Sequence, residues 1–270
     1  MSAPYPRARK RFGQHFLESA WVTRLVNLVD PNADDIFLEI GPGRGALTRA
    51  LAPRAGRVIA VEIDRDLAAA LPVTVPGNVT VVEGDFLAID LDTVLAEVPP
   101  GARPLRVIGN LPYNISSPIL FRLLHAADEG QRLSDATLML QKEVVDRLIA
   151  GPGSGDYGTL SIQVARVADV ERLLVLPPGA FRPPPKVTSA VVRLRFRPPA
   201  VDVGDPRVFE KVVRGIFLQR RKTLGNALKP VADALGRSSA EILERAGVDP
   251  RRRPETLALD DIARICRAML

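Results

Sequence analysis

Short, continuously apolar runs alternate with amphipathic segments through the first 150 residues of the chain. Apolar runs bounded by turn residues are typical of buried strands, and the segments between them have helical spacing. The predicted strands are 35–41, 57–64, 78–85, 104–110 and the first part of 135–150; the predicted helices are 43–56, 65–71, 91–98, 116–127 and the rest of 135–150. This alternation predicts an α/β fold, a Rossmann-like, mostly parallel sheet with helices on both faces.

The pattern changes in the second half of the chain. Two runs, 160–176 and 186–196, have β character without a clear helix between them, so we expect an antiparallel hairpin at one edge of the sheet. Prolines interrupt 197–206, and helical spacing continues from there to the end. The predicted domains are an α/β domain over 1–200, which opens with a basic segment at 1–17, and a small all-helical C-terminal domain over 201–270.

Charge is distributed unevenly along the 270 residues, which carry a net charge of +6. Residues 1–17 contribute +4 without an acidic side chain, and residues 201–270 contribute another +4. The segment between them has a net charge of −2. A slightly acidic body with basic ends favours a cofactor-binding core between two polyanion-binding surfaces. Solubility alone is the alternative explanation.

Composition argues against several classes of protein. The chain has one cysteine, Cys266, and two histidines, His15 and His125. An intramolecular disulfide is therefore impossible, and we expect no metal site. No apolar run approaches the length of a membrane span, and the N-terminal segment lacks the apolar stretch of a signal peptide. We therefore expect a cytoplasmic protein without a membrane partner, and a monomer, because no exposed apolar stripe indicates a dimer.

Three predicted strand ends carry candidate ligand-binding residues. Gly41 opens a glycine-rich loop between the first strand and the first helix, where backbone can approach a ligand closely. Glu62 ends the second strand about twenty residues later, where a carboxylate can accept both hydroxyls of a ribose. Asp85 ends the third strand and can accept from an adenine amine, and Phe86 beside it can cover a purine ring. These residues predict an adenosine-containing ligand. NAD and S-adenosylmethionine both qualify.

The fourth predicted strand ends in Asn110-Leu111-Pro112-Tyr113. The Asn110 side-chain oxygen and the Leu111 carbonyl can each accept one hydrogen of a planar amine, while Pro112 fixes the backbone. Tyr113 offers a ring on which a base can stack. Accepting both hydrogens withdraws the nitrogen lone pair from conjugation, so adenine N6 becomes a nucleophile for a sulfonium methyl group. A plain turn with a core tyrosine is the alternative.

These motifs resemble those of the ribosomal RNA adenine N6,N6-dimethyltransferases of the KsgA type. The stretches that carry the resemblance run in the family's order along nearly the whole chain: 11–17, 39–48, 110–120, 152–163, 181–194, 217–228 and 247–265. The stretches after residue 150 are specific to this family. The resemblance implies S-adenosylmethionine as the cofactor.

The resemblance also implies a role for individual residues. Gly41 lies against the cofactor, Glu62 on its ribose and Asp85 on its adenine amine. His15 and Leu17 contact the methionyl end, and Asn110 faces both cofactor and target amine. Tyr113 stacks on the target base in the family's reaction, and Phe181 is the second aromatic wall of its pocket. His15 stands where the family usually has asparagine, so its protonation state is a hypothetical source of pH-dependent cofactor affinity.

The implied substrate is a pair of adjacent adenosines in the loop of the 3′-terminal hairpin of 16S rRNA, within the immature small ribosomal subunit. Unpaired loop bases are the part of RNA that proteins read most readily. The predicted phosphate contacts are Arg7, Arg9, Lys10, Arg11, Arg220, Arg221 and Lys222. Two alternatives stay open: a large-subunit rRNA methyltransferase of the macrolide-resistance type, and a non-catalytic ribosome-assembly factor on the same fold.

Overall fold

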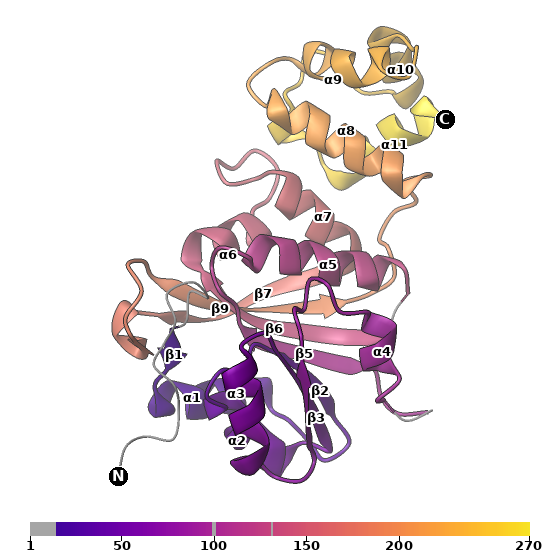
Figure 1. The fold of residues 1–270 in the computed structure, drawn as a ribbon. Helices are drawn as coiled ribbons and strands as arrows, with labels where there is room; N and C mark the ends of the chain where they lie inside the picture. Colours follow the sequence, from indigo (N-terminus) through magenta and orange to yellow (C-terminus); the bar gives the residue numbers. More distant parts are fainter. Residues whose placement is uncertain (1–14, 99–100, 131) are drawn as a thin grey trace. The chain divides into compact units, whose positions relative to one another are not determined.

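The computed structural model describes residues 15–98, 101–130 and 132–270 (Figure 1). The chain forms two compact units. The first comprises the described residues up to Val145 together with Glu171–Phe196, and the second comprises Asp146–Val170 together with Arg197–Leu270.

A seven-stranded sheet forms the centre of the first unit. Its strands, in spatial order, are β4 (Val79–Glu83), β3 (Arg57–Glu62), β2 (Ile36–Ile40), β5 (Leu105–Asn110), β6 (Leu133–Gln141), β9 (Ser189–Phe196) and β7 (Ala168–Leu176). The neighbours from β4 to β6 pair in parallel, whereas β9 runs antiparallel to β6. The predicted mostly parallel sheet with an antiparallel strand is therefore confirmed, and the two late β runs supply the last two strands at one side of the sheet, β9 and the edge strand β7.

Helices connect the strands. They are α1 (Ser19–Val29), α2 (Ala46–Leu51), α3 (Arg65–Ala70), α4 (Leu91–Leu95), α5 (Ser116–Asp128), α6 (Lys142–Ile149) and α7 (Thr159–Val167). Val22 of α1 and Leu47 of α2 pack with Phe37 of β2 in one apolar cluster. The sequence pattern did not identify α1, nor the short pair of strands β1 (Phe16–Leu17) and β8 (Phe181–Arg182).

The β prediction for 160–176 is wrong in its first half, where the chain forms α7. Leu160, Ile162 and Val164 alternate as in a strand, which explains the error. Ser161, the third residue of α7, caps the start of this helix. Its hydroxyl accepts from the Gly158 N–H at 3.1 Å and donates to the Arg147 carbonyl at 2.6 Å. This capping overrides the β propensity of the segment.

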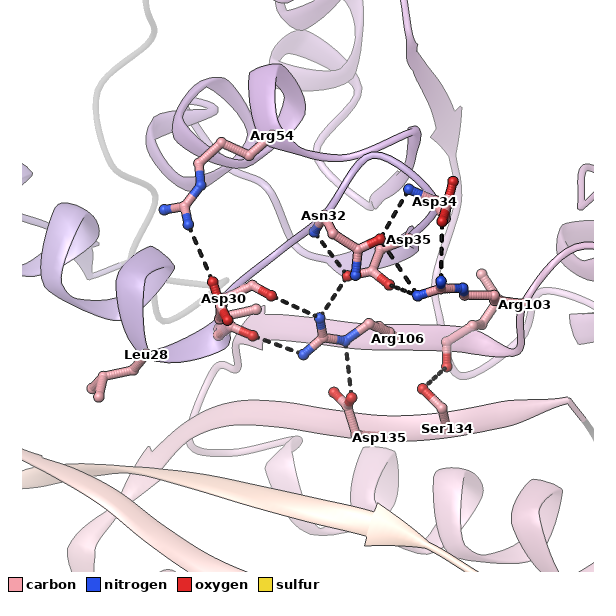
Figure 2. Close-up of polar contacts among 12 residues, drawn as sticks. Leu28, Asp30, Asn32, Asp34, Asp35, Arg54, Arg103, Arg106, Ser134 and Asp135 are labelled. Atoms are coloured by element: carbon pink, nitrogen blue, oxygen red, sulfur yellow. Dashed lines mark hydrogen bonds and ion pairs between the residues drawn. The ribbon is translucent and has the colours of Figure 1, made fainter.

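Arg106 connects residues near the start of β2 and β6 with the C-terminal end of α1 (Figure 2). Its guanidinium forms ion pairs with Asp35, just before β2, at 2.7 Å and with Asp135 on β6 at 2.9 Å. It also donates to the carbonyls of Val29 and Asp30 at 2.8 and 3.4 Å. These carbonyls lie at the C-terminal end of α1, where helix carbonyls lack partners. Arg106 therefore fixes α1, the helix that follows residues 15–17, to the sheet.

The second unit is helical apart from the start of β7. Its C-terminal part comprises α8 (Pro206–Leu218), α9 (Leu224–Asp233), α10 (Ser239–Ala246) and α11 (Leu259–Met269), which are the orange-to-yellow helices of Figure 1. Their apolar faces share one core. The loop at 151–158 is tied to this unit, because Tyr157 donates to the Leu257 carbonyl at 2.8 Å and Gly153 N–H to the Glu255 carbonyl at 2.7 Å.

Candidate active site

A cavity of about 310 Å³ opens in the first unit at the carboxyl ends of the parallel strands, the edge at which α/β sheets bind ligands. Nearly all predicted cofactor and base-binding residues line it. They are His15, Leu17, Gly41, Glu62, Asp85, Phe86, Asn110, Leu111 and Tyr113. The sequence motifs, which are up to about a hundred residues apart, therefore converge on one site.

The glycine loop and Glu62 form one wall. Gly41 and Gly43 have φ angles of +67° and +58°, a region that side chains other than glycine rarely adopt. Glu62 is only 3% exposed, and each of its carboxylate oxygens accepts a backbone N–H at 2.8 Å, from Gly43 and from Asp64. Burial raises the pKa of Glu62, and these backbone bonds oppose the shift. The carboxylate is thus held rigidly, with lone pairs left for a ligand's hydroxyls.

Asp85 and Phe86 follow β4 at another part of the cavity. Asp85 is exposed and accepts from the Leu87 N–H at 2.9 Å, which fixes the orientation of its carboxylate. Phe86 is buried, and the Arg122 guanidinium lies 5.4 Å from its ring centroid. Phe86 therefore combines a core position with a place in the cavity wall.

Asn110 ends β5 and orients the turn that follows. Its Nδ2 donates to the His15 carbonyl at 2.6 Å, so the amide is attached to the segment before β1. The next residue, Leu111, donates its N–H to the Met139 carbonyl at 3.3 Å and is buried. Because Nδ2 is committed to His15, the Asn110 oxygen is the part of this amide available to accept from a ligand.

Tyr113 is held at both ends. Its hydroxyl lies 2.6 Å from Ser189 Oγ on β9, and its carbonyl accepts from Ser116 Oγ at 3.1 Å. Burial raises the pKa of Tyr113, so the side chain stays a neutral phenol. The His15 ring is stacked near the Tyr113 ring, with centroids 5.8 Å apart and an interplanar angle of 23°. His15 Nδ1 donates to the Pro183 carbonyl at 2.7 Å, which holds the imidazole in that position.

Phe181 is the predicted aromatic residue that does not join the cavity wall. It is 1% exposed and packs in the apolar cluster that includes Leu176 and Ala180. Its backbone pairs with Leu17, so it supports the strand that carries a lining residue. In this structure the ring that faces Tyr113 is that of His15.

The predicted phosphate contacts fall into three groups. Arg7, Arg9, Lys10 and Arg11 lie outside the described residues. Arg221 and Lys222 are exposed in the loop between α8 and α9. Arg220 is instead committed to its own unit: it pairs with Glu255 at 3.0 Å and donates to the Gly155 carbonyl at 3.0 Å.

Glu39 is a lining residue that the sequence reasoning missed. It lies inside the apolar strand β2, and an acid within a continuously apolar run was the available signal. Arg44 of the glycine loop also lines the cavity, and its guanidinium lies 4.4 Å from the Phe16 ring centroid. Within the described residues, no group of three His, Cys, Asp or Glu side chains could hold a metal ion. No described helix is both long and apolar enough to cross a bilayer.

Comparison with known proteins agrees with this geometry. Residues 6–268 match the family described as ribosomal RNA adenine dimethylase. Ribosomal RNA small subunit methyltransferase A of Xanthomonas euvesicatoria is 47% identical over 273 residues, covering 100% of this chain and 98% of the relative. The protein of the same name from Geobacter sulfurreducens is also 47% identical, covering 98% of this chain and 96% of the relative.

Two solved structures are similar over almost the whole chain. A dimethyladenosine transferase from Plasmodium falciparum has a TM-score of 0.76 at 26% identity, with 93% of this chain and 96% of that chain covered. The 23S rRNA methyltransferase ErmE has a TM-score of 0.64 at 28% identity, with 94% and 99% covered.

The fold and the site define a Rossmann-like methyltransferase that uses S-adenosylmethionine, as predicted. The chain belongs to the ribosomal RNA adenine dimethylase family. The lining residues fit this cofactor: a glycine loop with positive φ angles allows close approach, Glu62 offers a carboxylate for ribose hydroxyls, and Asp85 offers one for an adenine amine.

Proposed function

We propose that this protein transfers methyl groups from S-adenosylmethionine to N6 of two adjacent adenosines in the loop of the 3′-terminal hairpin of 16S rRNA. The observation that supports this most strongly is the orientation of Asn110, whose amide nitrogen is tied to the His15 carbonyl while its oxygen is left to accept. The small-subunit relatives match over nearly the whole of both chains at 47% identity. ErmE is 28% identical, so a large-subunit enzyme is not favoured.

The cofactor supplies an electrophilic methyl group on a sulfonium when it is bound. Glu62 and Asp85 orient the adenosine part by accepting from its hydroxyls and its amine. Asn110 Oδ1 and the Leu111 carbonyl accept the two N6 hydrogens of the target base, which localises the nitrogen lone pair. Transfer of that methyl group would form a carbon–nitrogen bond at N6 as the carbon–sulfur bond breaks, and the extra proton on N6 would leave to water.

Tyr113 holds the target base by stacking, an interaction that contributes about 1–3 kcal/mol for a base on an aromatic ring. The Tyr113 ring is held in place for stacking, because its hydroxyl is hydrogen-bonded to Ser189 and its carbonyl accepts from Ser116. The imidazole of His15 lies next to the same ring. A base that stacks on Tyr113 therefore also meets His15, and we assign His15 to the pocket of the target base as well as to the cofactor. Phe181 does not contact the base in this proposal; it stabilises β1, whose Leu17 pairs with it.

The RNA-binding surface is proposed to include Arg221 and Lys222 and the basic residues at the N-terminal end of the chain. Exposed cations bind the phosphate backbone without sequence preference, and the pocket supplies the selectivity. Arg220 has a structural role in this proposal, because its guanidinium is paired within the second unit. We further propose that the protein acts as a monomer on the immature small subunit in the cytoplasm.

The test is to incubate the protein with labelled S-adenosylmethionine and immature small subunits, then to map the methylated nucleotides by mass spectrometry. Dimethylation of two neighbouring adenosines in the terminal hairpin of 16S rRNA supports the proposal. Asn110→Ala is the control and removes the signal. Methylation confined to large-subunit RNA or to DNA would refute the substrate assignment.

A further inference from the structure

Arg122 contacts the turn that follows β4, although it does not itself line the cavity. It lies on α5 and is half-buried. Its guanidinium carbon lies 5.4 Å from the centroid of the Phe86 ring, and its Nη2 atom donates to the Ile89 carbonyl. One side chain of α5 therefore contacts both a residue of the cavity wall and the end of the turn that carries this residue.

The turn itself is built around Asp85. The Asp85 carboxylate accepts from the Leu87 N–H at 2.9 Å. The Asp85 carbonyl accepts from the N–H groups of Ala88 and Ile89 at 2.9 and 2.8 Å. These bonds join the turn from its first residue to its last, so a displacement of Ile89 also moves Asp85. Arg122 therefore acts on Asp85 through the backbone of the turn, without touching the Asp85 carboxylate.

The helix that carries Arg122 gives the turn a firm support. Leu120 and Leu123, on either side of Arg122 in the chain, are buried, so this part of α5 is packed into the first unit. The first residue of α5, Ser116, donates to the Tyr113 carbonyl at 3.1 Å. A cation over an aromatic face is attracted by the ring, and a hydrogen bond from a guanidinium is stronger than one between neutral groups. Both contacts of Arg122 therefore restrict the turn before any ligand binds.

We propose that Arg122 is a positioning residue for the adenine end of the cofactor: through Phe86 and Ile89 it holds the Asp85 carboxylate where it accepts from the adenine amine. This rests on the role proposed above for Asp85, and it does not depend on which RNA the protein methylates. A turn that is ordered in advance loses less conformational entropy when the ligand binds. Arg122 thus increases both the affinity for the cofactor and the preference for adenine, without touching the ligand.

The test is calorimetric titration with two ligands that cannot react. S-adenosylhomocysteine carries the adenine amine, whereas S-inosylhomocysteine carries a carbonyl oxygen in its place. Wild type should bind S-adenosylhomocysteine about 10-fold or more tightly than S-inosylhomocysteine, because Asp85 loses a donor and faces a second acceptor. Arg122→Met keeps the apolar stem and removes the cation. It should weaken S-adenosylhomocysteine about 5–10-fold and S-inosylhomocysteine less than about two-fold, so the preference for adenine falls.

Two further variants separate positioning from a general loss of structure. Arg24→Met is the matched control: the Arg24 guanidinium carbon lies 5.6 Å from the Trp21 ring centroid on α1, and neither residue lines the cavity. It should leave both affinities within about two-fold of wild type. Arg122→Lys keeps a charge near Phe86 without the planar fork, and should restore part of the preference for adenine. Equal losses for the two ligands in Arg122→Met, or no loss for either, would overturn the proposal.

A last measurement uses wild type alone and covers the case in which Arg122→Met does not fold. The amides of Ala88 and Ile89 should exchange with solvent at least about 100-fold more slowly than in an unfolded chain, without any ligand. Rapid exchange of both amides, or equal affinity of wild type for the two ligands, would also overturn the proposal. None of these measurements uses RNA. A protein that gives the expected titrations but leaves 16S rRNA unmethylated would refute the proposed function and retain the role of Arg122.

Discussion

Replacing Arg106 by methionine should lower the free energy of unfolding by about 3–5 kcal/mol, the usual cost of removing one partner from a buried ion pair. The Arg106 side chain is 13% exposed, and its partners Asp35 and Asp135 are 6% and 15% exposed. The variant leaves Asp135 without its ion-pair partner, leaves Asp35 with only the longer ion pair to Arg103 at 3.9 Å, and leaves two carbonyls at the end of α1 without donors (Figure 2). Methionine retains most of the side-chain volume, so loss of packing contributes little.

Urea unfolding monitored by tryptophan fluorescence suits this measurement, because Trp21, the single tryptophan of the chain, lies on α1. Arg103→Met is the matched control. Arg103 pairs with Asp34 at 3.0 Å and more distantly with Asp35 at 3.9 Å, but its side chain is 57% exposed, so the variant should lose at most about 1 kcal/mol. Equal effects of the two substitutions would refute the assignment of Arg106 as the residue that fixes α1.

We also expect the stability lost in Arg106→Met to depend on pH. Burial already raises the pKa of Asp135 in wild type, and Arg106 opposes that shift, so its removal raises the pKa further. An acid whose pKa is higher in the folded state binds more protons when folded, and its destabilising effect therefore decreases as pH falls. The difference in stability between wild type and Arg106→Met should shrink from pH 7.5 to pH 5. A difference that grows over this range would contradict the reasoning.

Further substitutions test the site and the RNA surface. Asn110→Ala should lower the rate of methyl transfer by at least about 100-fold, the range for removing a group that stabilises the transition state, while thermal melting stays close to wild type. Tyr113→Ala should lower kcat/KM by about 10–100-fold through lost stacking, whereas Tyr113→Phe should stay within about three-fold; equal losses would argue against stacking. Joint replacement of Arg221 and Lys222 by glutamine should weaken RNA binding and reduce its salt dependence, as filter binding at several salt concentrations would show. Arg220→Gln should instead lower stability, and a change in RNA affinity alone would contradict its structural role.

The hydrophobic pattern and the residues at the predicted strand ends identified most of the sheet and most of the cavity lining. The glycine loop, Glu62 and Asn110 all lie at the ends of parallel strands, and such ends meet at one edge of the sheet whatever the rest of the fold does. Their convergence on one cavity therefore followed from the order of the predicted strands. The family's motifs added His15 and Leu17, which come from a segment whose position no strand–helix pattern could supply.

The sequence was less informative where position depends on tertiary packing. Phe181 precedes three prolines in the chain, and nothing local distinguishes a ring in a pocket wall from a ring in the core. The helix α7 begins because Ser161 finds the Arg147 carbonyl, which is a contact between segments. Arg220 looks like its exposed neighbours in the sequence, yet an acid 35 residues away pairs with it.

A structure of this protein bound to the small ribosomal subunit with S-adenosylhomocysteine tests the central claim most directly. The account predicts the target adenine stacked on Tyr113, with N6 within hydrogen-bonding distance of Asn110 Oδ1. An adenine seated away from Tyr113, or an Asn110 oxygen turned away from N6, would contradict it.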